Sequence, residues 1–267
     1  MAAPVEQWQL KVERQIASTA TSDVFLVSQR DNQPAVLKVL TSTGKSDEIN
    51  ASIILEWYQG HGSVNLIHHN ADALLIEYAE GRSLADMVFA GRDNEATAIA
   101  CNIVKKLHSG RAVSLASRLP ALDQRFSDLF TAAEKSKNAL VREAAQVATA
   151  LLETTRREVP LHGDLHHHNI IHSNRGWLTI DPKGLTGDPA YEVSNLFANP
   201  LNAHTLCTQP ERTRHLLDIC TSILGYEKER IARFAFVHNV LATIWAGTVD
   251  EPDQTSLEVA TNIRQHF

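Results

Sequence analysis

Three polar residues in one short segment have the types and the spacing that phosphoryl transfer requires. The stretch Leu161-His-Gly-Asp-Leu-His-His-His-Asn-Ile170 places Asp164 five residues before Asn169, and Asp181 follows twelve residues later. In phosphoryl transfer one carboxylate orients the acceptor hydroxyl and takes up its proton, while an amide and a second carboxylate hold Mg²⁺ on the nucleotide phosphates. The segment therefore predicts Asp164 as the catalytic base and Asn169 and Asp181 as the metal ligands.

The residues between Asn169 and Asp181 have the pattern of a β-hairpin. The apolar runs 170–172 and 177–180 flank the turn sequence Ser173-Asn174-Arg175-Gly176. A hairpin that begins after Asn169 and ends at Asp181 brings both residues to the same end, where their oxygens can converge on one ion. Two protein ligands are enough, because Mg²⁺ usually keeps several waters and binds phosphate oxygens as well.

A lysine lies in the middle of an apolar run near the N-terminus. Residues 35–40, Ala-Val-Leu-Lys-Val-Leu, predict a buried strand with Lys38 at its centre. A buried ammonium is costly unless it is paired, and a lysine that holds nucleotide phosphates and pairs with a glutamate satisfies that need. Glu48 in the next helical segment is the expected partner and Glu56 the alternative. An edge-strand lysine that reaches solvent is the competing interpretation.

A second candidate for phosphate binding lies between the first two expected strands. Residues 17–23, Ala-Ser-Thr-Ala-Thr-Ser-Asp, contain no glycine but several hydroxyls. We expect Ser18, Thr19 and Ser22 to bind phosphate oxygens together with nearby backbone N–H groups. An ordinary polar hairpin turn would have the same composition.

The elements that must position these residues divide the chain into two parts. Strand patterns at 8–12, 24–27 and 35–40 are followed by a helical spacing at 46–59 and two further strand patterns at 64–67 and 73–78. From residue 81 the chain is mainly helical apart from the catalytic segment, and one of the expected helices spans 121–134. We therefore expect an α+β fold with an antiparallel-sheet lobe at 1–78, a helical lobe at 79–267, and a nucleotide cleft near their boundary.

Composition narrows the class of protein further. The 267 residues carry a net charge of -6, which gives no electrostatic reason to bind nucleic acid or an anionic membrane. The first eight residues lack the features of a secretory signal, and the apolar run 234–247 is too short to span a bilayer. We expect a cytoplasmic protein; the sequence leaves its oligomeric state open. Adjacent histidines at 166–168 do not have the spacing of a zinc site.

The catalytic pattern also resembles a known superfamily. The order H-x-D-x-x-x-x-N, followed by a hairpin ending in aspartate, resembles the catalytic segment of the protein-kinase-like enzymes. His162-Gly-Asp and Ile180-Asp-Pro are similar to the motifs of aminoglycoside phosphotransferases, and no activation segment is present. The string Arg175-Gly-Trp-Leu-Thr-Ile-Asp-Pro182 with Gly184 and Gly187 resembles the aminoglycoside 6-phosphotransferases, the group of streptomycin 6-kinases and hydroxyurea phosphotransferases.

The resemblance implies a kinase that uses ATP and Mg²⁺ to phosphorylate the 6-hydroxyl on the streptidine ring of streptomycin, a cationic small molecule. It implies that Lys38 holds the phosphates and that the backbone of Glu77 and Ala79 binds the nucleobase. A kinase of another hydroxylated metabolite is an alternative on the same fold. A pseudokinase that only binds nucleotide is a second alternative, although Lys38, Asp164, Asn169 and Asp181 are all present.

A pocket for streptidine guanidinium groups needs carboxylates and an aromatic face. Trp245, Asp250 and Glu251 are the candidates. Core packing of Trp245 and solvated charge on the two acids are the competing interpretations. We expect Glu192 to brace the catalytic loop, residues 162–169, in which Asp164 lies. We expect Asp188 to cap the helix that begins directly after Asp188 and carries Glu192.

Overall fold

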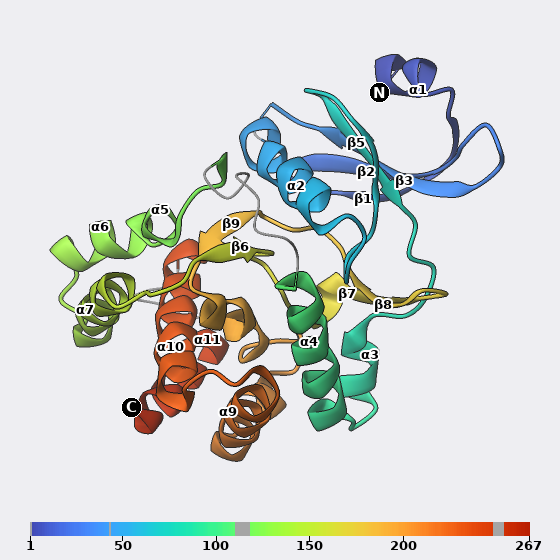
Figure 1. The fold of residues 1–267 in the computed structure, drawn as a ribbon. Helices are drawn as coiled ribbons and strands as arrows, with labels where there is room; N and C mark the ends of the chain where they lie inside the picture. The colour runs from blue at the N-terminus through green and yellow to red at the C-terminus, as the bar shows by residue number, and fades with distance from the viewer. Residues whose placement is uncertain (1, 43, 110–117, 248–253) are drawn as a thin grey trace.

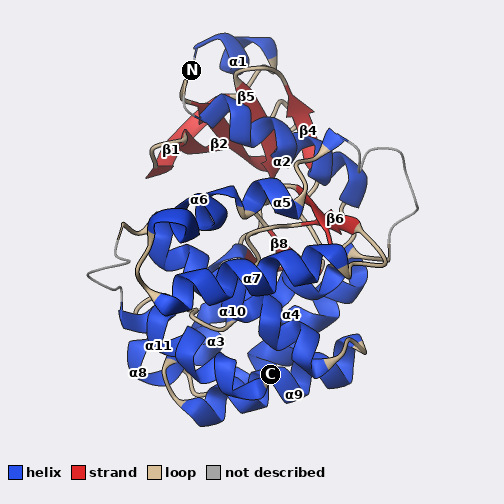
Figure 2. Cartoon of the chain, turned by 90° about the vertical axis from the view of Figure 1, so that its left-hand side faces the viewer, coloured by secondary structure: helices blue, strands red, loops and turns tan. Residues whose placement is uncertain are grey.

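The structure is a computed structural model, and it describes residues 2–42, 44–109, 118–247 and 254–267. A small lobe built on a sheet lies against a larger helical lobe, as Figure 1 shows. The second view shows that most of the helices belong to the larger lobe (Figure 2). The predicted α+β fold of two lobes is confirmed. The boundary at residue 79 stays a prediction.

The smaller lobe is a five-stranded antiparallel sheet with strand order β1-β2-β3-β5-β4. The predicted order of three strands, one helix and two strands is confirmed along the chain. Its elements are α1 (Ala2–Gln7), β1 (Lys11–Ser18), β2 (Ser22–Ser28), β3 (Pro34–Leu40), α2 (Gly44–Tyr58), β4 (Leu66–His69) and β5 (Ala73–Glu77).

The start of this lobe differs from the prediction. The alternation at residues 8–12 predicts a strand, but β1 begins only at Lys11, after the short helix α1. Leu10 belongs to the core of the sheet, and the Trp8 ring packs against the same core and stacks on His68 with centroids 5.8 Å apart. The apolar residues that suggested a strand therefore attach α1 to the sheet.

The larger lobe is a bundle of helices with two short two-stranded sheets, β6–β9 and β7–β8. The elements before the catalytic segment are α3 (Leu84–Phe89), α4 (Asp93–Leu107), α5 (Leu122–Arg125), α6 (Ser127–Lys135), α7 (Ala139–Glu153) and β6 (Val159–Leu161). A 3₁₀ turn at His167–Asn169, β7 (Ile170–Ser173), β8 (Gly176–Thr179) and β9 (Leu185–Gly187) form the catalytic segment. A 3₁₀ helix at Pro189–Leu196, α8 (His204–Cys207), α9 (Pro210–Leu224), α10 (Lys228–Trp245), α11 (Gln254–Ile263) and a last 3₁₀ turn at Arg264–His266 follow.

Helix α10 lies at the centre of this lobe. Nearly every residue from Ile231 to Leu241 is buried, because α6, α7, α9, α11 and the 3₁₀ helix 189–196 all pack around it. The apolar run at 234–247 is therefore a core helix, as its length predicts. No helix among the described residues has the length and apolar character to cross a membrane.

One predicted helix is broken in the structure. The apolar spacing at 121–134 predicts a single helix, whereas α5 ends at Arg125 and α6 begins at Ser127. Phe126 is fully buried at the junction and packs edge-to-face against Tyr191, with ring centroids 5.7 Å apart. Anchoring this ring bends the chain between two segments that share one apolar face.

The core of the larger lobe contains a histidine that should make its stability depend on pH. The Nδ1 atom of His238 on α10 lies 2.9 Å from the hydroxyl of Tyr191. Burial, assisted by the Arg125 charge, lowers the pKa of His238 to about 3 from an ordinary value of 6.5. The unfolded chain then takes up the proton more readily, so the stabilisation is complete above pH 6.5 and is lost as the pH falls toward 3.

We expect this histidine to contribute about 4 kcal/mol to the loss of unfolding free energy between pH 7 and pH 3. Urea unfolding of wild type and His238→Gln across this range measures the contribution. The variant should lose less stability on acidification than wild type. His215→Gln, at an exposed position of α9, is the matched control. Equal pH slopes for wild type and His238→Gln would contradict the assignment.

Candidate active site

The β7–β8 hairpin brings the three polar residues of the catalytic segment together. Ile170 pairs with Thr179, and the Ile180 N–H donates to the carbonyl of Asn169 at 2.9 Å, so the hairpin closes at its foot. The side-chain amide of Asn169 donates to the carbonyl of Asp164 at 3.0 Å. The predicted hairpin is confirmed, and it places Asn169 and Asp181 at the same end.

Asp181 has a backbone conformation that non-glycine residues seldom adopt. Its φ of 57° lies in the left-handed region. Such conformations cost free energy and persist only where the surrounding structure imposes them. Here β8 ends at Thr179, and the Asp181 carboxylate that follows it lies against Lys38 of β3.

Lys38 meets that carboxylate. Its ammonium lies 2.6 Å from Asp181 Oδ1, and only 8% of the residue is exposed. Burial alone would raise the pKa of Asp181, but the charge and hydrogen bond of Lys38 hold this pKa below its ordinary value. The buried lysine is therefore paired rather than directed to solvent.

Neither glutamate that was expected to pair with Lys38 is seen in contact with it among the described side chains. The side chain of Glu48 lies outside the described residues, so its pairing stays a prediction. Glu56 instead lies 3.0 Å from the Nε2 atom of His69.

A buried glutamate braces the catalytic loop, as predicted. The carboxylate of Glu192 accepts the backbone N–H of His162 at 2.9 Å and that of Gly163 at 3.1 Å. The Nε2 atom of His108 lies 3.1 Å from the same carboxylate. Burial alone would raise the pKa of Glu192, but the hydrogen bond and charge of His108 lower it. An ionised carboxylate thus fixes the loop directly before Asp164. Asp188 caps the following 3₁₀ helix through Ala190 N–H at 2.9 Å, which confirms its predicted role.

Asp164 has a side-chain partner that sequence reasoning missed. The Asn195 amide donates to Asp164 Oδ1 at 2.9 Å, and the Asn199 amide donates to the oxygen of Asn195 at 3.0 Å. Asn195 lies in the capped 3₁₀ helix at 189–196, and Asn199 follows it. An asparagine three residues after Glu192 has no spacing that separates it from an ordinary polar residue, so the sequence carries no signal for this contact.

Residues of the catalytic loop line two cavities. The first, of about 510 Å³, lies under the sheet and is lined by Lys38, Asn169 and Asp181. The second, of about 600 Å³, is lined by Asp164 and by residues of the helical lobe. Asn169 lines the first cavity, Asp164 lines the second, and a hydrogen bond links the two residues. The catalytic loop therefore forms part of the wall of both cavities.

Most residues predicted to contact nucleotide line the first cavity, namely Lys38, Thr19, Ser22, Glu77 and Ala79. Thr19 Oγ1 accepts the Ser22 N–H at 3.0 Å, which folds the segment into a tight turn above the cavity. Ser18 is not among the described lining residues. Its hydroxyl donates instead to Asp23 Oδ1 at 2.7 Å on the exposed edge of the sheet.

The second cavity is rich in amides and hydroxyls. Besides Asp164, the polar side chains in its described lining are His166, Asn195, Asn199, Asn202, His204, Asn239, Thr255 and Ser256. Asp164 is the one carboxylate in the part of the lining that the structure describes. Such a surface suits a ligand with several hydroxyl and amino groups.

The residues predicted to contact an acceptor are placed differently. The Trp245 indole N–H donates to Asp128 Oδ2 at 3.0 Å, and the Arg125 guanidinium lies 4.1 Å from the centre of its ring. Trp245 is not part of the described lining of either cavity. Asp250 and Glu251 lie outside the described residues.

Comparison with known proteins identifies the family. A family model described as aminoglycoside/hydroxyurea antibiotic resistance kinase matches residues 7–250. The chain belongs to this family. The kinase is 35% identical over 246 residues to a streptomycin 3''-kinase of Klebsiella pneumoniae, with 90% of each chain covered. It is 27% identical over 258 residues to a streptomycin 6-kinase of Streptomyces griseus, with 90% of this chain and 80% of that one covered.

The fold of this antibiotic resistance kinase is also that of a solved aminoglycoside phosphotransferase. A thermostable mutant of APH(4)-Ia, in a ternary complex with ADP and hygromycin B, superposes with a TM-score of 0.64 at 13% identity. The alignment covers 98% of this chain and 96% of the other. The resemblance to the aminoglycoside phosphotransferases and the prediction of a kinase are confirmed at the level of the family.

Proposed function

We propose that this chain transfers the γ-phosphoryl group of ATP to a hydroxyl of streptomycin. The observation that carries the proposal is that one loop lines two cavities, with Lys38 and Asp181 in the first and Asp164 in the second. The relatives named as streptomycin kinases support streptomycin as the acceptor. Within this proposal the 6-hydroxyl is the site of transfer, and the 3''-hydroxyl is the competing position that the test must separate.

Asp164 acts as the general base. An acceptor hydroxyl in the second cavity would donate its proton to the Asp164 carboxylate as the hydroxyl oxygen attacks the γ-phosphorus. The bond from this phosphorus to the bridging oxygen of ATP would break, and ADP would leave. Asn195 donates a hydrogen bond to Oδ1, and we propose that Oδ2 takes up the proton. Glu192 holds the backbone of the loop, and positioning of this kind supplies much of the catalysis in phosphoryl transfer.

Asn169 and Asp181 have the donor chemistry to hold Mg²⁺. The side-chain nitrogen of Asn169 donates to the carbonyl of Asp164, so the side-chain oxygen of Asn169 is the atom that can bind a cation. Asp181 adds a carboxylate whose pKa the Lys38 ammonium, working against burial, holds below its ordinary value. Bound Mg²⁺ would offset the negative charge on the β- and γ-phosphates. Lys38 adds a fixed positive charge in the same cavity and is proposed to bind the phosphates.

The remaining contacts are proposed from the cavity lining. Thr19 and Ser22 lie in the turn over the first cavity and would contact phosphate oxygens. The backbone of Glu77 and Ala79 would hold the nucleobase. Asp250 and Glu251 precede Thr255 by five and four residues in the sequence, and Thr255 lines the acceptor cavity. We propose these two acids as partners for the guanidinium groups of the acceptor.

A product analysis tests the proposal. The protein is incubated with MgATP and streptomycin, and the product is examined by mass spectrometry and by phosphorus-proton correlation NMR. The proposal expects one added phosphoryl group with its phosphorus coupled to the proton at position 6. Coupling to the proton at 3'' would keep the acceptor and overturn the position. An unmodified acceptor would overturn streptomycin as the substrate, and hydroxyurea, hygromycin B and choline should then be tried as acceptors.

The hydrogen bonds from Asn199 to Asn195 and from Asn195 to Asp164 lead to a prediction about kcat. Asn195→Ala removes the hydrogen bond that orients the base, so kcat should fall by about 10- to 100-fold with little change in KM for ATP. Steady-state kinetics on both substrates measure the effect. Asn202→Gly is the matched control, because Asn202 lines the same cavity and its φ of 65° is one that glycine tolerates. If Asn195→Ala has the same kcat as Asn202→Gly, the amide does not position the base.

A further inference from the structure

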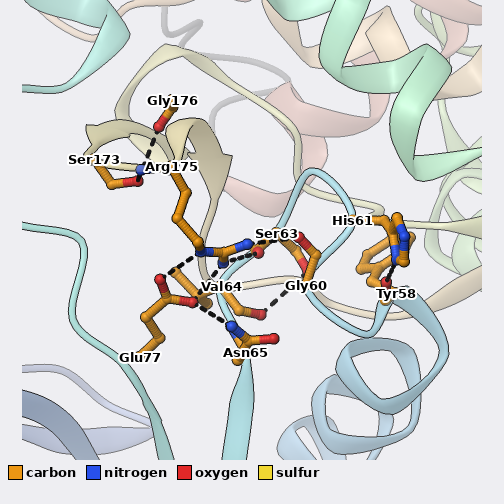
Figure 3. Close-up of polar contacts among 10 residues, drawn as sticks. All are labelled: Tyr58, Gly60, His61, Ser63, Val64, Asn65, Glu77, Ser173, Arg175 and Gly176. Atoms are coloured by element: carbon orange, nitrogen blue, oxygen red, sulfur yellow. Dashed lines mark hydrogen bonds and ion pairs between the residues drawn. The ribbon is translucent and has the colours of Figure 1, made fainter.

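The turn of the catalytic hairpin carries an arginine that reaches into the smaller lobe. The hydroxyl of Ser173 accepts the N–H of Arg175 at 3.1 Å and donates to the carbonyl of Gly176 at 3.0 Å. Gly176 has a φ of 91°, a conformation that favours glycine. The turn is therefore fixed, and Figure 3 shows the Arg175 side chain extending from it toward Glu77 and Ser63.

The guanidinium of Arg175 binds four acceptor atoms in the other lobe. Its Nε and Nη2 atoms donate to the two carboxylate oxygens of Glu77, at 2.9 and 2.5 Å. Its Nη1 and Nη2 atoms also donate to the carbonyls of Gly60 and Ser63, each at 3.1 Å. A bidentate pair with two further carbonyls uses the planar fork of an arginine in a way that a lysine cannot reproduce.

Glu77 is held on its other side as well. Its Oε2 atom accepts the backbone N–H of Asn65 at 2.9 Å and the side-chain amide of Asn65 at 2.8 Å. Burial would raise the pKa of Glu77, but the Arg175 hydrogen bonds and charge and the Asn65 donors lower it. The carboxylate is thus ionised and held by both Arg175 and Asn65, while Glu77, Tyr78 and Ala79 line the nucleotide cavity.

The same hairpin holds the other end of this connecting segment. The N–H of Gly81 donates to the carbonyl of His172 at 2.9 Å, and the N–H of His172 donates to the carbonyl of Arg82 at 2.9 Å. A Cβ on Gly81 would lie 2.2 Å from the His172 carbonyl oxygen, so the approach requires glycine. The hairpin therefore contacts the chain on both sides of Tyr78 and Ala79, through Glu77 before them and Gly81 after them. Both Tyr78 and Ala79 line the nucleotide cavity.

The foot of that hairpin carries the proposed metal ligands Asn169 and Asp181. We infer that Arg175 is a positioning residue for the nucleotide, which sets the spacing between the segment that would hold the base and the residues that would hold the phosphates and metal. This inference rests on the proposed function of the cavity as an ATP site. Arg175 touches neither cavity in the described lining, so it acts through Glu77.

Kinetics of Arg175→Ala test the inference. Losing the anchor at Glu77 should raise KM for ATP by about tenfold while KM for streptomycin and kcat change less than about threefold. Arg175→Lys should recover little of the loss, because one ammonium cannot replace the fork. Arg264→Ala removes an arginine that pairs with Glu143 at 2.7 Å on the surface of the larger lobe, and it serves as the matched control.

Binding of MgADP, measured by calorimetry, separates this inference from the proposed function. The inference expects weaker MgADP binding in Arg175→Ala than in Arg264→Ala, even if streptomycin proves not to be the acceptor. Equal MgADP binding in the two variants would overturn it, as would an equal rise in KM for both substrates. If Arg175→Ala does not fold, Glu77→Gln answers the question, since it keeps the shape and removes the charge. Unchanged MgADP binding in Glu77→Gln would then overturn the inference.

Discussion

Asp164→Asn is expected to lower kcat by about 1,000-fold while MgADP binding stays unchanged. A side-chain general base contributes on the order of 10²- to 10⁴-fold to a rate, and the amide cannot take up the proton of the acceptor. The substitution keeps the shape of the side chain and an oxygen that can accept the Asn195 amide, whose bond to Asp164 is 2.9 Å long. The loop itself is held through Glu192, so its backbone should not move.

The measurement for this first prediction is acceptor-dependent ADP release together with calorimetry of MgADP. Asp123→Asn, at an exposed position of α5, is the control for the chemical change. A variant Asp164→Asn with kcat within tenfold of wild type would remove Asp164 from the role of base.

Lys38→Met is expected to lower kcat/KM for ATP by about 100-fold or more, which corresponds to about 3 kcal/mol of transition-state stabilisation. Methionine approximates the apolar stem of the lysine without its ammonium, and Lys38 is 8% exposed in β3. The loss therefore comes from the ammonium, which lies 2.6 Å from Asp181 and faces the nucleotide cavity. Removing the ammonium also leaves the Asp181 carboxylate without its ion-pair partner.

Lys11→Met supplies the control for this second prediction. Lys11 lies in β1 of the same lobe, with an exposed side chain that pairs with Glu13. Initial rates at varied ATP and fixed streptomycin, with a thermal unfolding scan of each variant, separate a catalytic loss from a folding loss. Equal kcat/KM values for Lys38→Met and Lys11→Met would contradict the phosphate role.

The sequence predicts well those features that depend on residues close together in the chain. The hairpin from Asn169 to Asp181 is visible because two apolar runs flank a turn, and the pairing of its ends follows from its length. The order of strands around α2 is visible for the same reason. The helix expected at 121–134 is interrupted at Phe126, whose buried ring packs on Tyr191. The apolar spacing of the sequence continues through this bend and so does not reveal it.

Contacts between distant segments leave no such pattern. Arg175 meets Ser63 across 112 positions of the chain, and Trp245 meets Asp128 across 117. Nothing near Trp245 in the sequence distinguishes a ring that packs on Arg125 from a ring that stacks on a substrate. Asn195 likewise becomes informative only when the fold places its amide on Asp164.

Acceptor-dependent turnover tests the central claim most directly. The purified protein is mixed with MgATP, and ADP release is followed with and without streptomycin, for wild type and for Asp164→Asn. The account predicts that streptomycin strongly accelerates ADP release by wild type and that the acceleration is lost in the variant. ADP release by wild type that is no faster with streptomycin than without it would contradict the account.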